Sequence, residues 1–349
     1  MAVPTDVLLA KQALSDRLLQ AGLRGNVVAA ATTFRVDEVV ASARRNVHAV
    51  GVGRKIVNGE TIETASVRIY VTQKVAPSLL PPRDRLPETI DGIPTDVIES
   101  LPAFLASERP SEMSACTRDR KRRQRPVGAG ISAAHRDVTA GTISCFCRSI
   151  RRGDDPSKVY VMSNNHVFAN VNQSQIGGPL YQQGPADGGT ANDHFANLHR
   201  FIPMKLGGTE PNRVDAAIGE LSSEVEFQPE VCQIGKIKGI GEAVEDMDVC
   251  KHGRTTGYTE GTVTDESYNA LIGMDHNDPN VVALFENQVR IERTPPYLEI
   301  GPGGDSGSLV LSKSKAEAVG LYFAGPPSGR YGVANHIADV LSELQIELL

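Results

Sequence analysis

The chain has 349 residues, of which 40% are hydrophobic and 22% are charged, and its formal net charge at pH 7 is −6. This length allows two domains with sizeable cores. The mildly acidic, mixed charge argues against nucleic acid or an anionic membrane surface as the main partner. No apolar run approaches the length of a membrane-spanning helix, so no membrane partner is expected.

The first residues predict a helix and no secretion signal. The stretch "MAVPTDVLLAKQALSDRLLQ" lacks a basic start and carries Asp6 early, which favours a cytoplasmic protein. After Thr5, apolar residues recur at helical spacing until Gly22, so a helix is expected over residues 5–21. A second, short helix is expected from about Asp37 to Arg45.

Strands follow this helical region. The stretch "HAVGVGRKIVNGETIETASVRIYVTQK" predicts two strands around an Asn58-Gly59 turn, and a further strand is expected from Thr95 to Glu99. Residues 1–105 are therefore interpreted as a small N-terminal α+β domain, helical over 1–45 and stranded over 46–100. Whether this domain inhibits the rest of the chain, recruits substrate or only stabilises it is left open.

A basic segment comes next, in "SEMSACTRDRKRRQRPVG". Like charges repel one another, so residues 106–126 are expected to form a solvated linker. A site of proteolytic nicking and a contact for an acidic partner remain as alternatives. The basic residues are Arg118, Arg120, Lys121, Arg122, Arg123 and Arg125.

From Val127 onward the pattern is that of an all-β barrel or sandwich. Some ten short apolar stretches are separated by Gly, Pro, Asn and Asp turns, with no helical period between them. The polar segment from Asn170 to Asn212 is long for a loop, and "YQQGPADGG" within it is a candidate lining of a substrate cleft. The final stretch "IADVLSELQIELL" predicts a C-terminal helix that buries one apolar face.

The five cysteines are an odd number without C-x-x-C spacing, which argues against a disulfide framework or a zinc ribbon. Cys145 and Cys147 would share one face of a strand. Burial as core thiols is therefore expected for them, with redox or metal chemistry as the alternative. No acidic cluster has the spacing of a calcium loop, so no metal is expected.

The stretch "EIGPGGDSGSLVL" combines a glycine-rich knot with an apolar strand. A serine hydroxyl becomes a good nucleophile only when a base accepts its proton and a third group orients that base. For Ser306 the best base is His166, at the end of an apolar strand, and the best orienter is Asp215, where an acid enters another strand. Taken singly, His166 could be structural and Asp215 a strand-start cap. Together, in the order His, Asp, Ser within an all-β body, they predict a catalytic triad.

On the motifs "SNNHVFA", "RVDAAIGEL" and "GPGGDSGSLV", residues 127–349 resemble the chymotrypsin-fold, trypsin-like serine peptidases. From about Val47 the chain resembles a bacterial family of intracellular trypsin-like peptidases related to the narrow-leaf-type proteases of plants. The motifs of that second resemblance are "VGVGRKIVNGE", "IDGIPTDVIE", "ISAAHRDVTAGTI", "LYQQGPADGG" and "VCKHGRTTGYTEGTV". The first 45 residues are not covered.

The resemblance implies a mainly β, chymotrypsin-like double barrel. His166 and Asp215 would come from the first barrel and Ser306 from the second. The backbone N–H groups of Gly304 and Ser306 would form the oxyanion hole. Secreted relatives pair the Asp beside the serine with an N-terminus made by cleavage. No such N-terminus is evident here, so Asp305 is expected to be an ordinary hydrogen-bonding loop residue.

The substrate expected from this resemblance is a protein or peptide, with no cofactor and with an oligomeric state left open. Ile300 would lie at the base of the primary pocket, and "GLYFAG" would supply an apolar wall through Tyr322, Phe323 and Ala324. An apolar side chain is therefore expected before the cleaved bond. Two alternatives to an endopeptidase stay open: a trypsin-fold binding or scaffold module, and a serine esterase.

Overall fold

The computed structural model describes residues 3–25, 46–57, 59–105, 119–275, 278 and 281–349. The helix expected from Asp37 to Arg45 lies outside these residues. The described chain forms two compact units. The first comprises residues 1–105, 205–212 and 264–290, and the second comprises the remainder, so each unit includes parts of the strands β19 (Gly257–Gly273) and β20 (Val282–Arg293).

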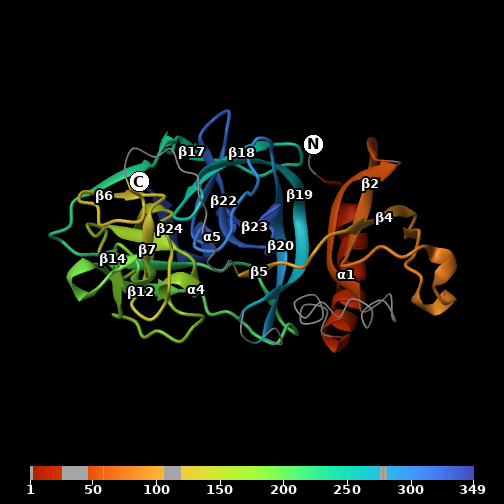
Figure 1. Ribbon diagram of the computed structural model, residues 1–349, viewed down its shortest axis with the longest axis horizontal. Coiled ribbons are helices and arrows are strands. Elements are labelled where there is room, and N and C mark those ends of the chain that lie inside the picture. The colour runs from red at the N-terminus through yellow and green to blue at the C-terminus, as the bar shows by residue number, and fades with distance from the viewer. Residues whose placement is uncertain (1–2, 26–45, 58, 106–118, 276–277, 279–280) are drawn as a thin grey trace. The chain divides into compact units, whose positions relative to one another are not determined.

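The first unit is a small α+β body in which α1 (Thr5–Gly25) packs on a sheet (Figure 1). β1 (Val47–Val57) pairs antiparallel with β2 (Glu60–Val71), and the hairpin confirms the expected turn because Val57 faces Glu60. β4 (Ile93–Glu99) adds to β2 in parallel. The shorter elements are β3 (Thr89–Ile90), β5 (Phe104–Leu105), β13 (Pro211–Asn212) and the 3-10 turns η2 (Pro77–Leu79) and η3 (Pro82–Asp84).

The apolar face of α1 explains why this helix forms on the sheet. Val7, Leu14, Leu18 and Leu19 of α1 are buried in the core of this unit, and Leu14 is completely inaccessible to solvent. A buried leucine of this kind contributes about 2 to 5 kcal/mol, because its removal leaves a cavity. The helix continues to Gly25, past the predicted stop at Gly22.

The second unit contains an eight-stranded sheet in the order β24-β9-β10-β14-β12-β11-β7-β8. Most residues of its strands are buried, around a core that includes Phe146, Phe168 and Phe195. The members are β7 (Ser132–His135), β8 (Gly141–Thr142), β9 (Cys145–Ser149), β10 (Tyr160–Ser163), β11 (Pro179–Tyr181), β12 (His194–Phe201), β14 (Ala217–Leu221) and β24 (Ile346–Leu348).

A second antiparallel set in this unit runs through β18, β21, β22 and β23. β18 also forms a hairpin with β19, in which Gly253 pairs with Gly257. The set is β18 (Asp248–Gly253), β21 (Leu309–Ser312), β22 (Glu317–Gly325) and β23 (Tyr331–His336). The remaining elements are β6 (Val127–Ala129), β15 (Phe227–Val231), β16 (Gly235–Lys236), β17 (Gly239–Ile240), α4 (Asn165–Phe168), α5 (Ile337–Leu344), η4 (Pro185–Asp187) and η5 (Ala191–Asp193).

The expected fold class is confirmed. The chain is mainly β, its sheets curl like the half-barrels of a chymotrypsin-like fold, and an α+β region precedes them. Among the described residues, no helix has both the length and the apolar character needed to cross a membrane.

The C-terminal helix is confirmed over Ile337–Leu344, and two local details differ from the expectation. The segment from Asn170 to Asn212 is not one long loop, because β11 and β12 pair with each other inside it. The C-terminal helix ends at Leu344, because Gln345 adopts a left-handed conformation (φ 51°) and the next residues leave the helix. Ile346 then pairs with Ser149 of β9, so the chain closes the sheet as a strand.

The cysteine and linker predictions hold only in part. Cys145 and Cys147 are buried free thiols, as expected, and burial raises the pKa of Cys145 to about 12. Cys232, however, is disulfide-bonded, although the cysteine pattern argued against a disulfide framework. Cys116 lies outside the described residues. The basic segment is also not solvated throughout, because Arg120 is only 8% exposed.

Candidate active site

His166 and Asp215 meet where two neighbouring strands end. Ser163, the last residue of β10, pairs with Ala217, the first residue of β14, so residues just beyond these ends lie at the same edge of the sheet. His166 Nδ1 lies 2.5 Å from Asp215 Oδ2, and the His166 backbone N–H donates to Asp215 Oδ1 at 3.2 Å. The carboxylate thus holds both the ring and the backbone of the histidine.

The Asp215 side chain is completely buried, so its position must be fixed by partners. Its backbone N–H donates to Asn335 Oδ1 on β23 at 3.0 Å, and its carbonyl accepts from Asn164 Nδ2 at 2.8 Å. Neither asparagine was predicted from the sequence to belong to the site. Asn164 is part of the motif "SNNHVFA", but nothing local marks Asn335, which comes from 120 residues further along the chain.

Ser306 lies just before β21 and is 1% exposed. Its Oγ donates to the Phe323 carbonyl at 3.2 Å. His166 Nε2 is buried and has no hydrogen-bond partner among the described residues. The structure therefore joins His166 to Asp215 and leaves Ser306 paired elsewhere. Such a nucleophile–base contact is often absent or long before substrate binds.

Thr142, at the end of β8, ties the serine loop to the strand that precedes His166. Its N–H donates to the Ser306 carbonyl and its Oγ1 donates to the Gly304 carbonyl, both at 2.8 Å. Its own carbonyl accepts from Ser163 Oγ at 2.8 Å. Gly307 adopts a φ of 93°, and a Cβ there would collide with Ser163 Oγ. This close approach explains why the glycine-rich turn requires a glycine at position 307, directly after Ser306.

The N–H groups around Ser306 divide into two sets. Those of Gly307 and Ser308 donate within the fold, to the carbonyls of Tyr322 and Asp305. Those of Gly304 and Ser306 are the expected oxyanion donors. Gly304 has a φ of 88°, and a Cβ there would lie 2.5 Å from Thr255 Oγ1, so this position also requires glycine.

Asp305 is not an ordinary loop residue, which corrects the expectation from sequence. Its side chain is completely buried, and Oδ2 lies 2.8 Å from Nζ of Lys251, which is 1% exposed. The Thr255 N–H donates to Oδ1 at 2.7 Å, and the hydroxyl of Thr256 donates to Oδ2 at 2.5 Å. Burial lowers the pKa of Lys251, and the charge of Asp305 opposes that shift. A lysine directly after the apolar Val249 and Cys250 of β18 was the sequence signal that could have indicated this pair.

The residues expected to form the substrate pocket are all buried: Ile300, Tyr322, Phe323 and Ala324. A Cβ on Gly332 would touch both the Tyr322 ring and Ile300 Cγ2, so these two side chains lie over the same glycine. The Tyr322 hydroxyl donates to the Gly301 carbonyl. Tyr322 therefore fills space next to Ile300, and Phe323 contributes the carbonyl that Ser306 contacts.

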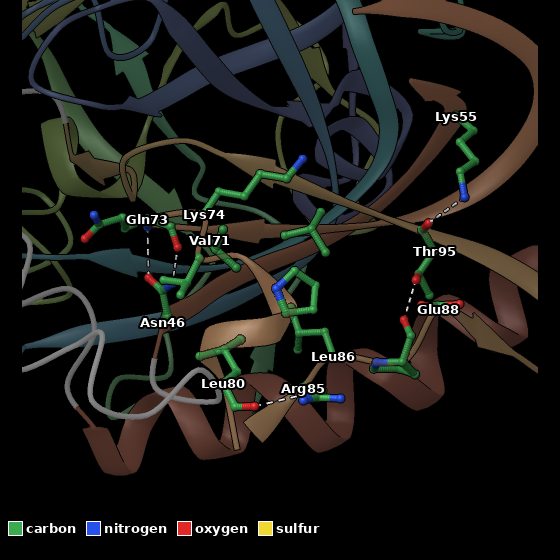
Figure 2. Close-up of a pocket in the computed structure, with 14 residues that line it drawn as sticks. Asn46, Lys55, Val71, Gln73, Lys74, Leu80, Arg85, Leu86, Glu88 and Thr95 are labelled. Carbon is green, nitrogen blue, oxygen red and sulfur yellow. Dashed lines mark hydrogen bonds between the residues drawn. The ribbon is translucent and has the colours of Figure 1, made fainter. Parts of the chain in front are cut away.

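A cavity of about 340 Å³ lies in the first unit and is shown in Figure 2. It has an aliphatic lining and several Lys and Arg side chains, but no serine, cysteine or histidine that could pair as nucleophile and base. Among the described residues, no group of three or more His, Cys, Asp or Glu is arranged to hold a metal ion. The cavity is lined by Asn46, Lys55, Val71, Gln73, Lys74, Val75, Pro77, Leu80, Arg85, Leu86, Pro87, Glu88, Thr95 and Val97.

No protein-family model matches the chain. It is 22% identical over 316 residues to Protein NARROW LEAF 1 of Oryza sativa subsp. japonica, an alignment that covers 78% of this chain and 50% of that protein. The chain thus spans about half the length of this curated relative.

Solved structures similar to the chain are proteases. Protease A of Thermobifida fusca matches with a TM-score of 0.44 and 17% identity, over 64% of this chain and 98% of that chain. The chymotrypsin of Cellulomonas bogoriensis matches with a TM-score of 0.42 and 15% identity, over the same shares. A glutamic-acid-specific serine protease matches with a TM-score of 0.43 and 17% identity, over 64% of this chain and 100% of that chain.

Proposed function

We propose that the protein is a serine endopeptidase that cleaves protein or peptide substrates through an acyl-enzyme on Ser306. The observation that carries this proposal is the 2.5 Å contact between His166 Nδ1 and the buried Asp215 carboxylate, with His166 Nε2 left without a partner. An imidazole held in this way on one nitrogen presents the other as a base. The glycine-rich Ser306 loop, tied through Thr142 to the strand before His166, supplies the nucleophile.

In the proposed reaction, Ser306 Oγ leaves the Phe323 carbonyl and gives its proton to His166 Nε2 as it attacks the substrate carbonyl. The carbonyl oxygen becomes negative and accepts hydrogen bonds from the N–H groups of Gly304 and Ser306. Such donors contribute on the order of 3 kcal/mol each. His166 then protonates the leaving amine, and a water molecule, activated by the same histidine, releases the acyl group. Asp215 stays ionised and stabilises the imidazolium.

The proposed enzyme needs no proteolytic activation. Trypsin-like relatives shape the loop around the serine with a new N-terminus, as the resemblance implies. Here the ammonium of Lys251 already occupies the partner position at Asp305, from within the chain. We therefore expect the loop to be formed as soon as the chain folds.

A competing function is a binding or scaffold module. The observation that favours it is the Ser306 Oγ hydrogen bond to Phe323 in place of His166. A fluorophosphonate probe separates the two, because it modifies only a serine that a base activates. Stoichiometric labelling of the wild type, absent in Ser306→Ala, together with hydrolysis of a peptide library supports the peptidase. A wild type that neither labels nor hydrolyses would exclude it.

We also propose membership of the intracellular trypsin-like peptidases and a cytoplasmic location. The motifs shared with that bacterial family and the free thiols of Cys145, Cys147 and Cys250 support this proposal. The disulfide at Cys232 counts against a reducing compartment. Fractionation of cells that express the full chain, with thiol labelling of each fraction, tests the location.

A further inference from the structure

Arg120 lies beneath the loop that carries the proposed oxyanion donors. Its Nε donates to the Arg254 carbonyl at 2.8 Å and its Nη2 donates to the Thr255 carbonyl at 2.6 Å. Its own carbonyl accepts from the Ser132 N–H at 2.9 Å, which anchors the arginine to β7. The guanidinium thus spans two successive carbonyls of the β18–β19 turn, a geometry that suits its planar set of donors.

The turn held by Arg120 in turn holds the serine loop. The Thr255 N–H donates to Asp305 Oδ1 at 2.7 Å, and Thr255 Oγ1 donates to the Gly303 carbonyl at 2.6 Å. The Arg254 N–H donates to Thr142 Oγ1 at 3.0 Å. The Thr255 N–H belongs to the peptide unit whose carbonyl, that of Arg254, accepts from Arg120, and the other two donors belong to the same two residues.

The side chain of Arg254 adds a second support. It is 6% exposed and forms a bidentate pair with Asp187, with distances of 2.8 and 2.5 Å. Its Nη1 lies 3.0 Å from the position that a Cβ on Gly304 would occupy. Arg254 therefore packs directly against the residue that supplies one oxyanion N–H.

Arg120 is held near the serine loop by carbonyls and not by an ion pair. Lys251 is paired with Asp305, and Arg254 is paired with Asp187. Arg120 contacts no carboxylate among the described residues, although Asp305, Asp119 and Asp187 lie near enough to stabilise its charge. An arginine stays protonated in a protein. Its positive charge next to the serine loop favours the transition state, in which the substrate oxygen becomes negative.

We propose that Arg120 is a positioning residue of the active site, which fixes the Arg254–Thr255 peptides and through them the N–H of Gly304. This inference rests on the proposed peptidase activity. It assigns a role to a residue of the basic segment, which otherwise has the composition of a linker. Since the oxyanion exists only in the transition state, the loss of Arg120 should change kcat and leave KM nearly unchanged.

The test compares three variants of the full chain. Arg120→Met removes both donors and the charge at similar volume, and Arg120→Lys keeps the charge but cannot span both carbonyls. The matched control is Arg122→Met, since Arg122 belongs to the same segment, is 82% exposed and forms a side-chain ion pair with Asp119. For each protein we would measure kcat, KM, the affinity for a peptide boronate that forms a tetrahedral adduct on Ser306, and the affinity for the product peptide.

The expected result is a roughly 10²-fold loss of kcat in Arg120→Met, comparable with the loss of one oxyanion donor. Boronate affinity should fall in parallel, while KM and product affinity stay within about twofold, and Arg120→Lys should be intermediate. Arg122→Met should match the wild type. A purely structural role would weaken boronate and product equally, and that outcome overturns the inference.

Three further outcomes are decisive. If Arg120→Met does not fold, as judged by circular dichroism, the same measurements on Arg120→Lys decide, and wild-type kcat and boronate affinity there would contradict the inference. If the wild type reacts with a fluorophosphonate and folded Arg120→Met reacts equally fast, the inference fails and the proposed function stands. If the wild type does not react at all, both fail.

Discussion

Lys251 and Asp305 form an ion pair in the interior of the second unit, with 2.8 Å between Nζ and Oδ2 and side-chain exposures of 1% and 0%. The pair joins β18 to the loop that carries Ser306. Lys251 Nζ also lies 5.5 Å from the centroid of the Tyr322 ring, and this cation–π contact further stabilises the ammonium. A pair buried in this way is costly to break, because removing one partner strands the other charge.

Lys251→Met should therefore destabilise the second unit by about 3 to 5 kcal/mol and abolish activity, since the Asp305 carboxylate must then find water or accept a proton. Chemical unfolding and fluorophosphonate labelling measure the two effects. The control is Lys313→Met, which breaks a surface pair with Glu260 and should cost no more than about 1 kcal/mol. A stable, active Lys251→Met would show that the ion pair does not shape the loop.

Ser306→Ala and His166→Ala should each abolish peptide hydrolysis and leave the fold intact. The double variant should be no worse than either single variant, because nucleophile and base act as one unit. Steady-state kinetics on the three proteins provides the measurement. Substantial peptide cleavage by Ser306→Ala would remove the proposed mechanism.

Asp215→Asn should lose about 10⁴-fold in kcat, the figure known for this substitution in the chymotrypsin-type triad. The amide NH2 group of the asparagine can donate a hydrogen bond to His166 Nδ1. The imidazole then carries its proton on Nε2, and this tautomer cannot accept the proton of Ser306. Binding of the product peptide should be retained, because Asp215 does not contact substrate in this proposal. Retention of more than about a tenth of wild-type kcat would contradict the role of Asp215 as orienter.

Cleavage is expected after apolar side chains, and after small ones in preference to large ones. Ile300 offers no charge for Lys or Arg, and the buried Tyr322 ring fills space over Gly332 beside it. A peptide library with a varied residue before the scissile bond gives the profile. Strong preference for Arg or Lys would show that Ile300 does not lie at the base of the primary pocket.

Acidification should destabilise the second unit through His252. This side chain is completely buried, its Nδ1 lies 2.8 Å from the Gly130 carbonyl, and burial, together with the charges of Lys251 and Arg120, lowers its pKa to about 4. In the unfolded chain this histidine has a pKa near 6.5. Between about pH 6.5 and pH 4 the unfolded state therefore binds the proton more readily than the folded state does. The free energy of unfolding should thus fall as the pH drops from about 6.5 towards 4, by up to roughly 3 kcal/mol.

Thermal unfolding at pH 7 and pH 5 measures this effect. His252→Gln, which cannot titrate, should lose less stability over this interval than the wild type. Asp305 also faces His252, and His48 in the first unit shares the lowered pKa, so some pH dependence should remain. An equal loss in both proteins would exclude His252 as a source of the acid sensitivity.

Local sequence patterns were enough to predict much of this protein. The Asn58-Gly59 hairpin, the helix from Thr5, the short strands and the burial of Cys145 depend on neighbours in the chain, and the structure confirms them. The candidate triad of His166, Asp215 and Ser306 was likewise visible as motifs in one order, and its catalytic role stays a prediction.

Only the tertiary structure decided which polar groups meet inside the fold. The cation beside Asp305 comes from 54 residues earlier in the chain, and Arg120 contacts carbonyls 134 and 135 residues away. The last residues form β24 because the edge of β9 offers unpaired backbone groups, a condition absent from their own sequence. A buried charge is tolerated only where partners converge on it, and that convergence is a property of the packed structure, so local sequence patterns could not reveal it.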